Sequence, residues 1–255
     1  MTTNLTPDTP AQDKAGFLFR YRFWFICLSY FAGFECYQFD RVNIVVLAVG
    51  WIYGNRDPQL ASLGARHLLQ GLFSLSALIV TAAGWIRTWG AAYLRTDVVH
   101  DSAVHTERLV ADGPYRHLRN PLYLGTLLLA IGLAMLASRL GAVIIVLGNL
   151  LIVLRLIARE EAAMLQSQGE AYRAFLAAVP SLWPSLRPSV PAGGMEPKWA
   201  QAFQGEIHIW IFALAGFYFA WTLDSHLYLK LLWVAAGAYL VVNVLPRRLR
   251  RGTSR

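Results

Sequence analysis

The chain has few charged residues and few cysteines. Charged side chains make up only 15% of its 255 residues, whereas a soluble domain usually contains about 25%. Its two cysteines, Cys27 and Cys36, lie in or beside the first apolar segment and form no C-x-x-C motif. We therefore expect free thiols and no metal site. Residues 1–16 are polar and lack a hydrophobic stretch with a small-residue cleavage site, so we expect no signal peptide.

Apolar and aromatic residues dominate instead. Hydrophobic residues make up 56% of the chain, which has nine tryptophans, eleven tyrosines and thirteen phenylalanines, and its mean hydropathy is +0.42. This aromatic enrichment is typical of bilayer interfaces. The net charge of +8 comes largely from arginines at the ends of apolar runs, which is typical of topology signals and contacts with anionic lipid. The composition thus predicts an all-α, polytopic membrane protein that binds no nucleic acid.

Six apolar segments are long enough for membrane helices, which need roughly 20 residues. They are residues 18–37, 67–86, 121–137, 140–158, 207–223 and 228–246. A further run, 42–53, is only about 18 Å long as a helix, so we interpret it as interfacial or partly inserted, with a short span as the alternative. Six spans place both termini and the arginine-rich loops on one side, which the positive-inside rule makes cytoplasmic.

The third and fourth predicted spans form a tight antiparallel hairpin, because only a short turn near 137–139 separates them. In one register of this hairpin Gly125 faces Gly148 and Gly132 faces Gly141. Small residues that face each other let membrane helices approach closely. We therefore expect these four glycines to lie at the contact between the two helices.

The same register places two carboxylates beside a basic and aromatic segment. Glu160 lies level with Gly113, so that Glu160 and Glu161 emerge beside GPYRHLRNPLY (113–123) at the predicted cytoplasmic boundary. The alternative to a functional site is a solvated helix end whose acids pair with nearby arginines. The convergence of rigid prolines, tyrosines and both charge signs favours a functional site.

Other polar groups suggest no second site. His100 and His105 are spaced as a possible metal pair, but no convincing further ligands accompany them, so we expect no metal. Glu206 and His208 stand at the entrance of the fifth span, and we interpret them as an interfacial helix cap. The stretch PSLWPSLRPSVPAGG that begins at Pro180 is interrupted by prolines and cannot be a continuous helix.

The order of motifs resembles a known family. GPYRHLRNPLYLG (113–125), an apolar hairpin and REEAAMLQSQGEAYRAFLAAVPSLWP (159–184) together resemble the isoprenylcysteine carboxyl methyltransferase and phospholipid methyltransferase family, over roughly residues 85–187. The resemblance implies an integral membrane enzyme that binds S-adenosylmethionine in a cytoplasmic pocket and takes a lipid or lipidated acceptor from the bilayer. One departure is Asn120, where the family has a histidine. Asparagine gains no proton near neutral pH, so an acid or base role at this position is unsupported.

The resemblance also implies roles for individual residues. The catalytic candidates are Arg119, Asn120 and Tyr123, and Gly169 and Tyr172 match an element that folds back over the site. Chemically, carboxylates suit the ammonium or ribose of the cofactor, an arginine suits its carboxylate, and tyrosine rings suit its adenine and sulfonium. The cofactor-binding candidates are Tyr115, Arg116, His117, Arg119, Pro121, Tyr123, Gly125, Glu160, Glu161 and Tyr172.

On this basis we divide the chain into N-terminal membrane helices (1–84), a methyltransferase core (85–190) and C-terminal membrane helices (191–255). Two other functions stay open: an NADPH-dependent membrane reductase of related architecture, and a lipid-binding protein without enzymatic activity. No G-x-G-x-x-G motif occurs, although membrane reductases need not use one. No well-placed histidine–carboxylate pair is evident, which slightly favours an anionic acceptor that needs no base. The sequence leaves the acceptor, the membrane and the oligomeric state open.

Overall fold

The computed structural model describes residues 21–54, 62–94, 111–239 and 241. The regular structure in these ranges is helical, with no β-strand beyond a single bridge between Asn43 and Ser138, so the predicted all-α class is confirmed. Cys27 and Cys36 are free, and His100 and His105 lie outside the described residues.

The helices are α2 (Arg22–Glu35), α3 (Ile44–Tyr53), α5 (Leu63–Tyr93), α7 (Pro121–Ala134), α8 (Arg139–Ala178), α9 (Trp199–Gly205), α10 (Ile207–Thr222) and α11 (Ser225–Tyr239), with short 3-10 turns η1 (Cys36–Gln38) and η2 (Gly113–Arg116).

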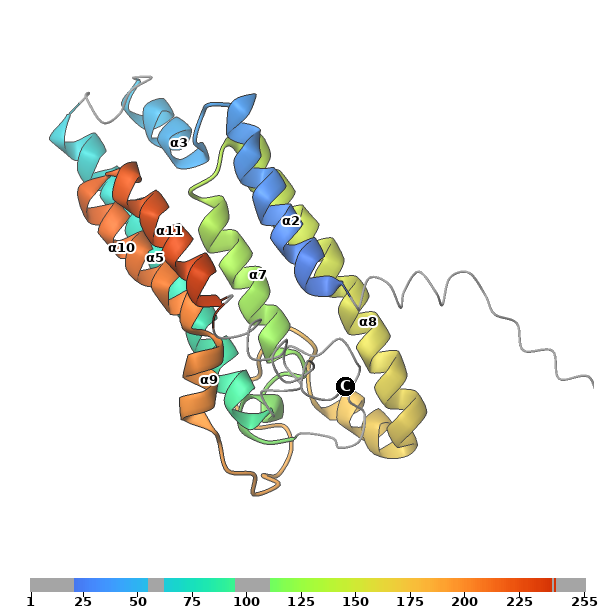
Figure 1. Ribbon diagram of the computed structural model, residues 1–255. Coiled ribbons are helices and arrows are strands. Elements are labelled where there is room, and N and C mark those ends of the chain that lie inside the picture. The colour runs from blue at the N-terminus through green and yellow to red at the C-terminus, as the bar shows by residue number, and fades with distance from the viewer. Residues whose placement is uncertain (1–20, 55–61, 95–110, 240, 242–255) are drawn as a thin grey trace, which may run out of the picture.

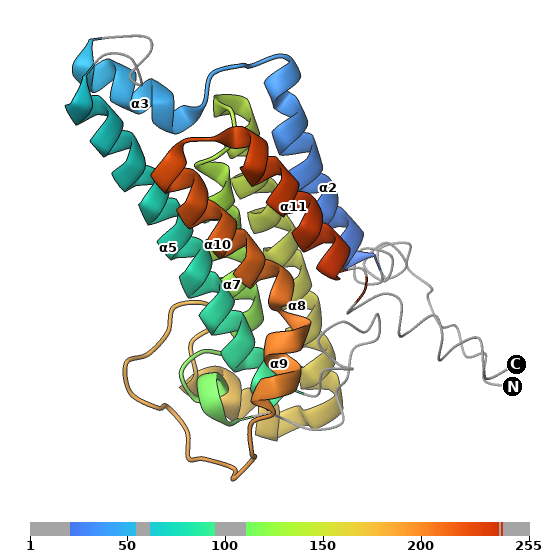
Figure 2. The ribbon, with the colours of Figure 1, turned by 60° about the vertical axis from the view of Figure 1, so that its left-hand side comes forward.

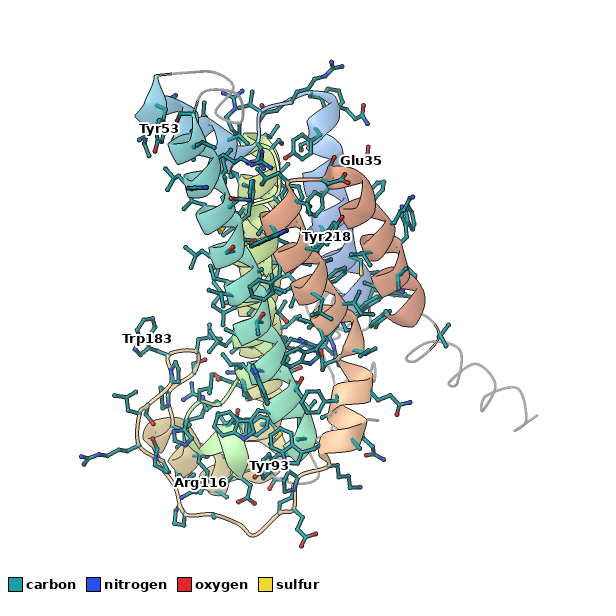
Figure 3. The ribbon with its side chains drawn as sticks, turned by 90° about the vertical axis from the view of Figure 1, so that its left-hand side faces the viewer. Glu35, Tyr53, Tyr93, Arg116, Trp183 and Tyr218 are labelled. Carbon is teal, nitrogen blue, oxygen red and sulfur yellow. The ribbon has the colours of Figure 1, made fainter. Side chains whose placement is uncertain are left out.

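Helices α2, α5, α7, α8, α10 and α11 run along the long axis of one bundle (Figures 1 and 2). Each covers at least part of one of the predicted spanning segments. Helices α5 and α8 are long and apolar enough to cross a membrane, whereas α7 and α10 are apolar but shorter. The number of crossings and their orientation stay predictions. Figure 3 shows Tyr93, Arg116 and Trp183 at one end of the bundle and Glu35 and Tyr53 at the other.

Helix α3 lies across the end of the bundle at which α5 begins (Figure 2). The Asn43 side chain caps it by accepting hydrogen bonds from the backbone N–H groups of Val45 and Val46 at 2.9 and 3.0 Å. Val45 and Val49 are buried against residues of α5. Its ten residues extend about 15 Å, half of a hydrocarbon core of about 30 Å. This length agrees with the interfacial interpretation.

The hairpin of α7 and α8 is present, but the predicted glycine register is wrong. The glycines of α7 face α5: a Cβ built at Gly125 meets the side chain of Arg87, and one at Gly132 meets the side chain of Val80. The glycines of α8 face α2 instead. The inner face of the hairpin is lined by an alanine-rich cluster of buried residues: Ala130, Ala134, Ala137, Ala142 and Ile145. Small residues mark close approach, but the glycines of α7 lie at its contact with α5, and Gly141 and Gly148 of α8 lie at its contact with α2.

The closest of these approaches joins α8 to α2. A Cβ at Gly141 would lie 2.1 Å from the carbonyl oxygen of Gly33, a backbone atom. Farther along the same contact, Gly148 lies against Ser29, and the Asn149 side-chain amide donates to the Ser29 hydroxyl at 2.8 Å. Helix α2 therefore packs antiparallel along the first part of α8 (Figure 1).

The last part of α8 turns back at Gly169. This glycine has φ 55° and ψ −126°, a conformation that is essentially restricted to glycine. The chain beyond it is helical to Ala178, and residues 179–198 that follow form no helix, as the prolines predicted. The non-helical segment is held by backbone hydrogen bonds from Ser185 to the His117 carbonyl and from Ser189 to the Arg116 carbonyl.

Candidate active site

The basic and aromatic segment forms η2 and the start of α7. Pro114 stands in the first turn of η2, where its fixed φ and missing N–H are tolerated. Gly113 has φ 55°, and a Cβ there would lie 2.3 Å from the Tyr93 ring. The buried Asp112 carboxylate accepts backbone hydrogen bonds from Gly193 and Met195 at 2.6 and 3.1 Å. The turn is therefore fixed both by its own proline and glycine and by the segment that follows α8.

The two carboxylates of α8 do meet this segment. The Tyr123 hydroxyl donates to Glu160 Oε1 at 2.6 Å. The glycine register had placed Glu160 level with Gly113, ten positions before Tyr123 in the sequence. The wrong register predicted the right cluster because the acids and the segment lie at the same end of the hairpin.

Glu161 makes different contacts. Arg119 Nε donates to Glu161 Oε1 at 3.0 Å, and Asn120 Nδ2 donates to the same oxygen at 3.3 Å. Arg119 Nη1 also donates to the carbonyl oxygens of Leu176 and Val179 at 2.7 and 2.5 Å. Arg119 and Glu161 thus tie the start of α7 to the end of α8.

Asn120 occupies the place of the family histidine. Besides Glu161, its Nδ2 donates to the Ser181 hydroxyl at 3.1 Å, and its backbone N–H donates to the Ser181 carbonyl at 3.2 Å. Both contacts hold the chain beyond α8. The amide therefore acts here as a hydrogen-bond donor that positions backbone and carboxylate.

Tyr172 follows the turn at Gly169, and the charges of the same two acids act on it. It is buried beside Phe175. Burial raises the pKa of Tyr172 to about 12, and the charge of Glu161 adds to the rise while that of Arg119 opposes it. The element that the sequence predicted to fold back thus brings a neutral phenol to the carboxylates.

The side chains of Arg116 and His117 contact the chain beyond α8 and Trp89. Arg116 Nε donates to the Val190 carbonyl at 2.9 Å. The His117 Nδ1 atom lies 2.9 Å from the Ser185 carbonyl, and its ring lies 6.0 Å from that of Trp89. Both side chains hold the segment after α8, which encloses this end of the bundle.

Pro121 and Gly125 are packing positions of α7 against α5. A Cβ at Gly90 would lie 3.3 Å from Pro121 Cγ, and a Cβ at Gly125 would lie 2.3 Å from Arg87 Cγ. Gly125 therefore leaves the space through which the Arg87 side chain passes. Neither residue supplies a polar side-chain group for a ligand.

A buried ion pair next to the site was not predicted. Arg87 Nε and Nη2 donate to the two oxygens of Glu206 at 2.8 and 2.9 Å, and Arg87 Nη1 donates to Thr126 at 2.9 Å. The Glu206 side chain is fully buried. The interpretation of Glu206 as an interfacial cap is wrong: it precedes α10, but its carboxylate makes no capping hydrogen bond and binds Arg87. The sequence shows an arginine and a glutamate at the ends of two apolar segments, but nothing in it indicates that the two residues pair.

Two further groups interact electrostatically with Glu160. The charge of Arg22, at the start of α2, acts on both Tyr123 and Glu160. The Tyr115 hydroxyl is buried and has no hydrogen-bond partner among the described residues. Burial raises the pKa of Tyr115, and the charge of Glu160 raises it further. This phenol therefore stays neutral and keeps its O–H as a hydrogen-bond donor.

The fold and site define an all-helical protein whose paired carboxylates meet a stiff basic and aromatic turn at one end of an apolar bundle. Residues 72–171 match the model of the phospholipid methyltransferase family. The match covers this central region of the chain and confirms the resemblance to that family. The match includes η2, α7 and the residues Arg119, Tyr123, Glu160 and Glu161. No curated protein and no solved structure gives a significant match to the chain.

Proposed function

We propose that the protein is an integral membrane methyltransferase that uses S-adenosylmethionine and acts on a lipid or lipidated acceptor. The observation that carries the proposal is the hydrogen bond between Tyr123 and Glu160 beside the Arg119–Glu161 ion pair. All four residues lie within the segment that matches a methyltransferase family. The long apolar helices α5 and α8 suit an acceptor that arrives through the bilayer.

The residues present fit the cofactor. Glu161 is neutralised by Arg119, whereas Glu160 accepts a hydrogen bond from a neutral donor, the Tyr123 hydroxyl. We therefore assign the ammonium or ribose of S-adenosylmethionine to Glu160. The buried Tyr115 hydroxyl, which has no partner in the described ranges, supplies a donor that a bound ligand would satisfy.

When bound, S-adenosylmethionine supplies the methyl group, and its sulfur keeps the electron pair of the broken carbon–sulfur bond. The chain has to hold the acceptor in line with that bond and to exclude water. Such positioning contributes roughly 7–11 kcal/mol in intramolecular analogues. The rings of Tyr115, Tyr123 and Tyr172 suit the sulfonium charge, and the Arg119–Glu161 tie holds Tyr172 and its segment against the start of α7.

The contacts favour an acceptor that needs no general base. Asn120 replaces the histidine of the family and binds Glu161 and Ser181. The nearest histidine in the sequence, His117, contacts the Ser185 carbonyl. A carboxylate acceptor is already nucleophilic at neutral pH, whereas an amine must first lose a proton. We therefore propose an anionic acceptor, with the site lying on the cytoplasmic side.

Calorimetry in detergent with S-adenosylhomocysteine tests this function. We expect the intact protein to bind it and Glu160→Gln to weaken binding about 10- to 100-fold, because charge-assisted hydrogen bonds contribute about 1.5–3 kcal/mol. Glu170→Gln is the matched control, since Glu170 lies on the same helix but is exposed and pairs with Arg173. Absence of binding by the intact protein, or full binding by Glu160→Gln, would reject the proposal.

The acceptor itself is accessible to a second experiment. Membrane lipids incubated with methyl-deuterated S-adenosylmethionine, with and without the protein, are compared by mass spectrometry. We expect a mass increase on a lipophilic carboxylate. Label on an amine instead would retain the methyltransferase and refute the base-free acceptor.

A further inference from the structure

Helix α2 lies outside the family segment of residues 72–171, yet it reaches the site. Its antiparallel contact with α8 is fixed by Gly33 against Gly141 and by Ser29 against Asn149. Extending this register to the start of α2 places Arg22 beside residues 152–156, about one to two helical turns before Glu160. Figure 1 shows α2 following α8 along this length. A long arginine side chain bridges about one turn, so the near end of this range brings Arg22 within reach of the carboxylate.

The electrostatics agree with this register. Among the charged side chains that act on Glu160, Arg22 has the largest effect, ahead of Arg159, its neighbour on α8. Arg22 also acts on Tyr123, the hydrogen-bond donor of Glu160, more strongly than Arg87 does. The Nη1 atom of Arg22 is buried. Arg22 is therefore the cation whose charge acts most strongly on the Tyr123–Glu160 pair.

Three other arginines near the site make contacts away from Glu160. Arg116 donates to the Val190 carbonyl, Arg119 pairs with Glu161, and Arg87 pairs with Glu206. Arg116 and Arg119 were among the cofactor-binding candidates from the sequence, and an arginine suits the cofactor carboxylate. Their contacts in the structure favour a different residue for that role.

We infer that Arg22 binds the carboxylate of the amino-acid moiety of S-adenosylmethionine, while Glu160 binds the ammonium group of the same moiety. The inference rests on the proposed function. The ammonium and the carboxylate are attached to one carbon atom, so their site needs opposite charges side by side. Arg22 from α2 and Glu160 from α8 provide this arrangement, and a guanidinium binds a carboxylate through two parallel hydrogen bonds.

Comparison of two ligands tests the assignment: S-adenosylmethionine and its decarboxylated form, which keeps the ammonium but lacks the carboxylate. By calorimetry in detergent we expect Arg22→Gln to weaken binding of S-adenosylmethionine about 10- to 100-fold and to leave binding of the decarboxylated form unchanged. Glu160→Gln should weaken both. Arg139→Gln is the control, because Arg139 begins α8 at its other end and pairs with Asp40.

Each outcome decides the assignment. Equal losses for the two ligands would show that Arg22 only stabilises the fold around the site. An unchanged affinity for S-adenosylmethionine would show that Arg22 makes no contact with the cofactor carboxylate. Both results overturn the inference. If the intact protein binds neither ligand, the proposed function falls with it. If Glu160→Gln behaves as expected and Arg22→Gln does not, only the role of Arg22 falls. Should Arg22→Gln fail to fold, Arg22→Lys has to weaken S-adenosylmethionine more than the decarboxylated ligand.

Discussion

The contact between α2 and α8 gives a sharp prediction for Gly141→Ala. The new methyl group would lie 2.1 Å from the carbonyl oxygen of Gly33 and 3.0 Å from its carbonyl carbon, whereas Cβ atoms essentially never approach another heavy atom closer than 3.0 Å. Both neighbours are backbone atoms, so no change of rotamer relieves the clash. The two helices have to separate, and Arg22 moves with α2.

Two opposing terms set the magnitude. Replacing glycine by alanine inside a helix is favourable by about 0.8–1.0 kcal/mol, whereas overpacking costs typically 1–3 kcal/mol. Because the clash involves two backbones, we use the upper end of that range. The expected net destabilisation is therefore about 2 kcal/mol, accompanied by weaker binding of S-adenosylmethionine.

Gly148→Ala is the matched control for the same pair of helices. Its new methyl group would meet only the Ser29 side chain, at 3.2 Å, so we expect a change in stability within about 1 kcal/mol. Thermal unfolding in detergent, followed by tryptophan fluorescence, measures both variants. Equal stabilities for the two variants would refute the close approach of α2 and α8, and with it the register that carries Arg22 to Glu160.

Three other substitutions test the rest of the site. Gly169→Ala places alanine at φ 55° and ψ −126°, which costs about 1–3 kcal/mol; limited proteolysis should cleave the chain beyond this turn faster than in the intact protein. Glu206→Gln leaves the buried charge of Arg87 uncompensated, so the free energy of unfolding in denaturant should fall by about 3–5 kcal/mol. Tyr115→Phe removes a hydroxyl that has no partner among the described residues; stability without ligand should stay within about 0.5 kcal/mol, while calorimetry should show about 2- to 10-fold weaker binding of S-adenosylhomocysteine.

Apolar runs predicted most of the helices. Helices α7 and α8 occupy the predicted hairpin, and α3 begins and ends within one residue or two of the run 42–53. Such runs identify helices because the burial of an apolar segment dominates its local choice of structure. The turn at Gly169 was not predicted as a break in α8, although the resemblance indicated a fold-back there. A single glycine inside an otherwise helical pattern gives no sign of its backbone angles.

Contacts between distant helices were harder to predict. The glycines of α7 and α8 correctly indicated close approach, but a small residue says nothing about which helix approaches. For the same reason the pairing of Arg87 with Glu206 and the approach of Arg22 to Glu160 have no local signal, since their partners are far apart in the sequence. The two carboxylates of α8 and the segment 113–123 were predicted to meet because motif order and hairpin geometry both bring them to one end, but the pairing of Tyr123 with Glu160 was not specified.

The two acidic residues of α8 have different tasks because they point in different directions. Neighbouring residues of a helix are about 100° apart around its axis, so the side chains of Glu160 and Glu161 leave α8 in different directions. Glu161 meets Arg119, which also holds the Leu176 and Val179 carbonyls, and Glu160 meets Tyr123 and the charge of Arg22. With one carboxylate α8 therefore holds the chain beyond Ala178, and with the other it provides the group to which we assign the ligand. Any shift of α8 that disturbs the first contact must also move the second.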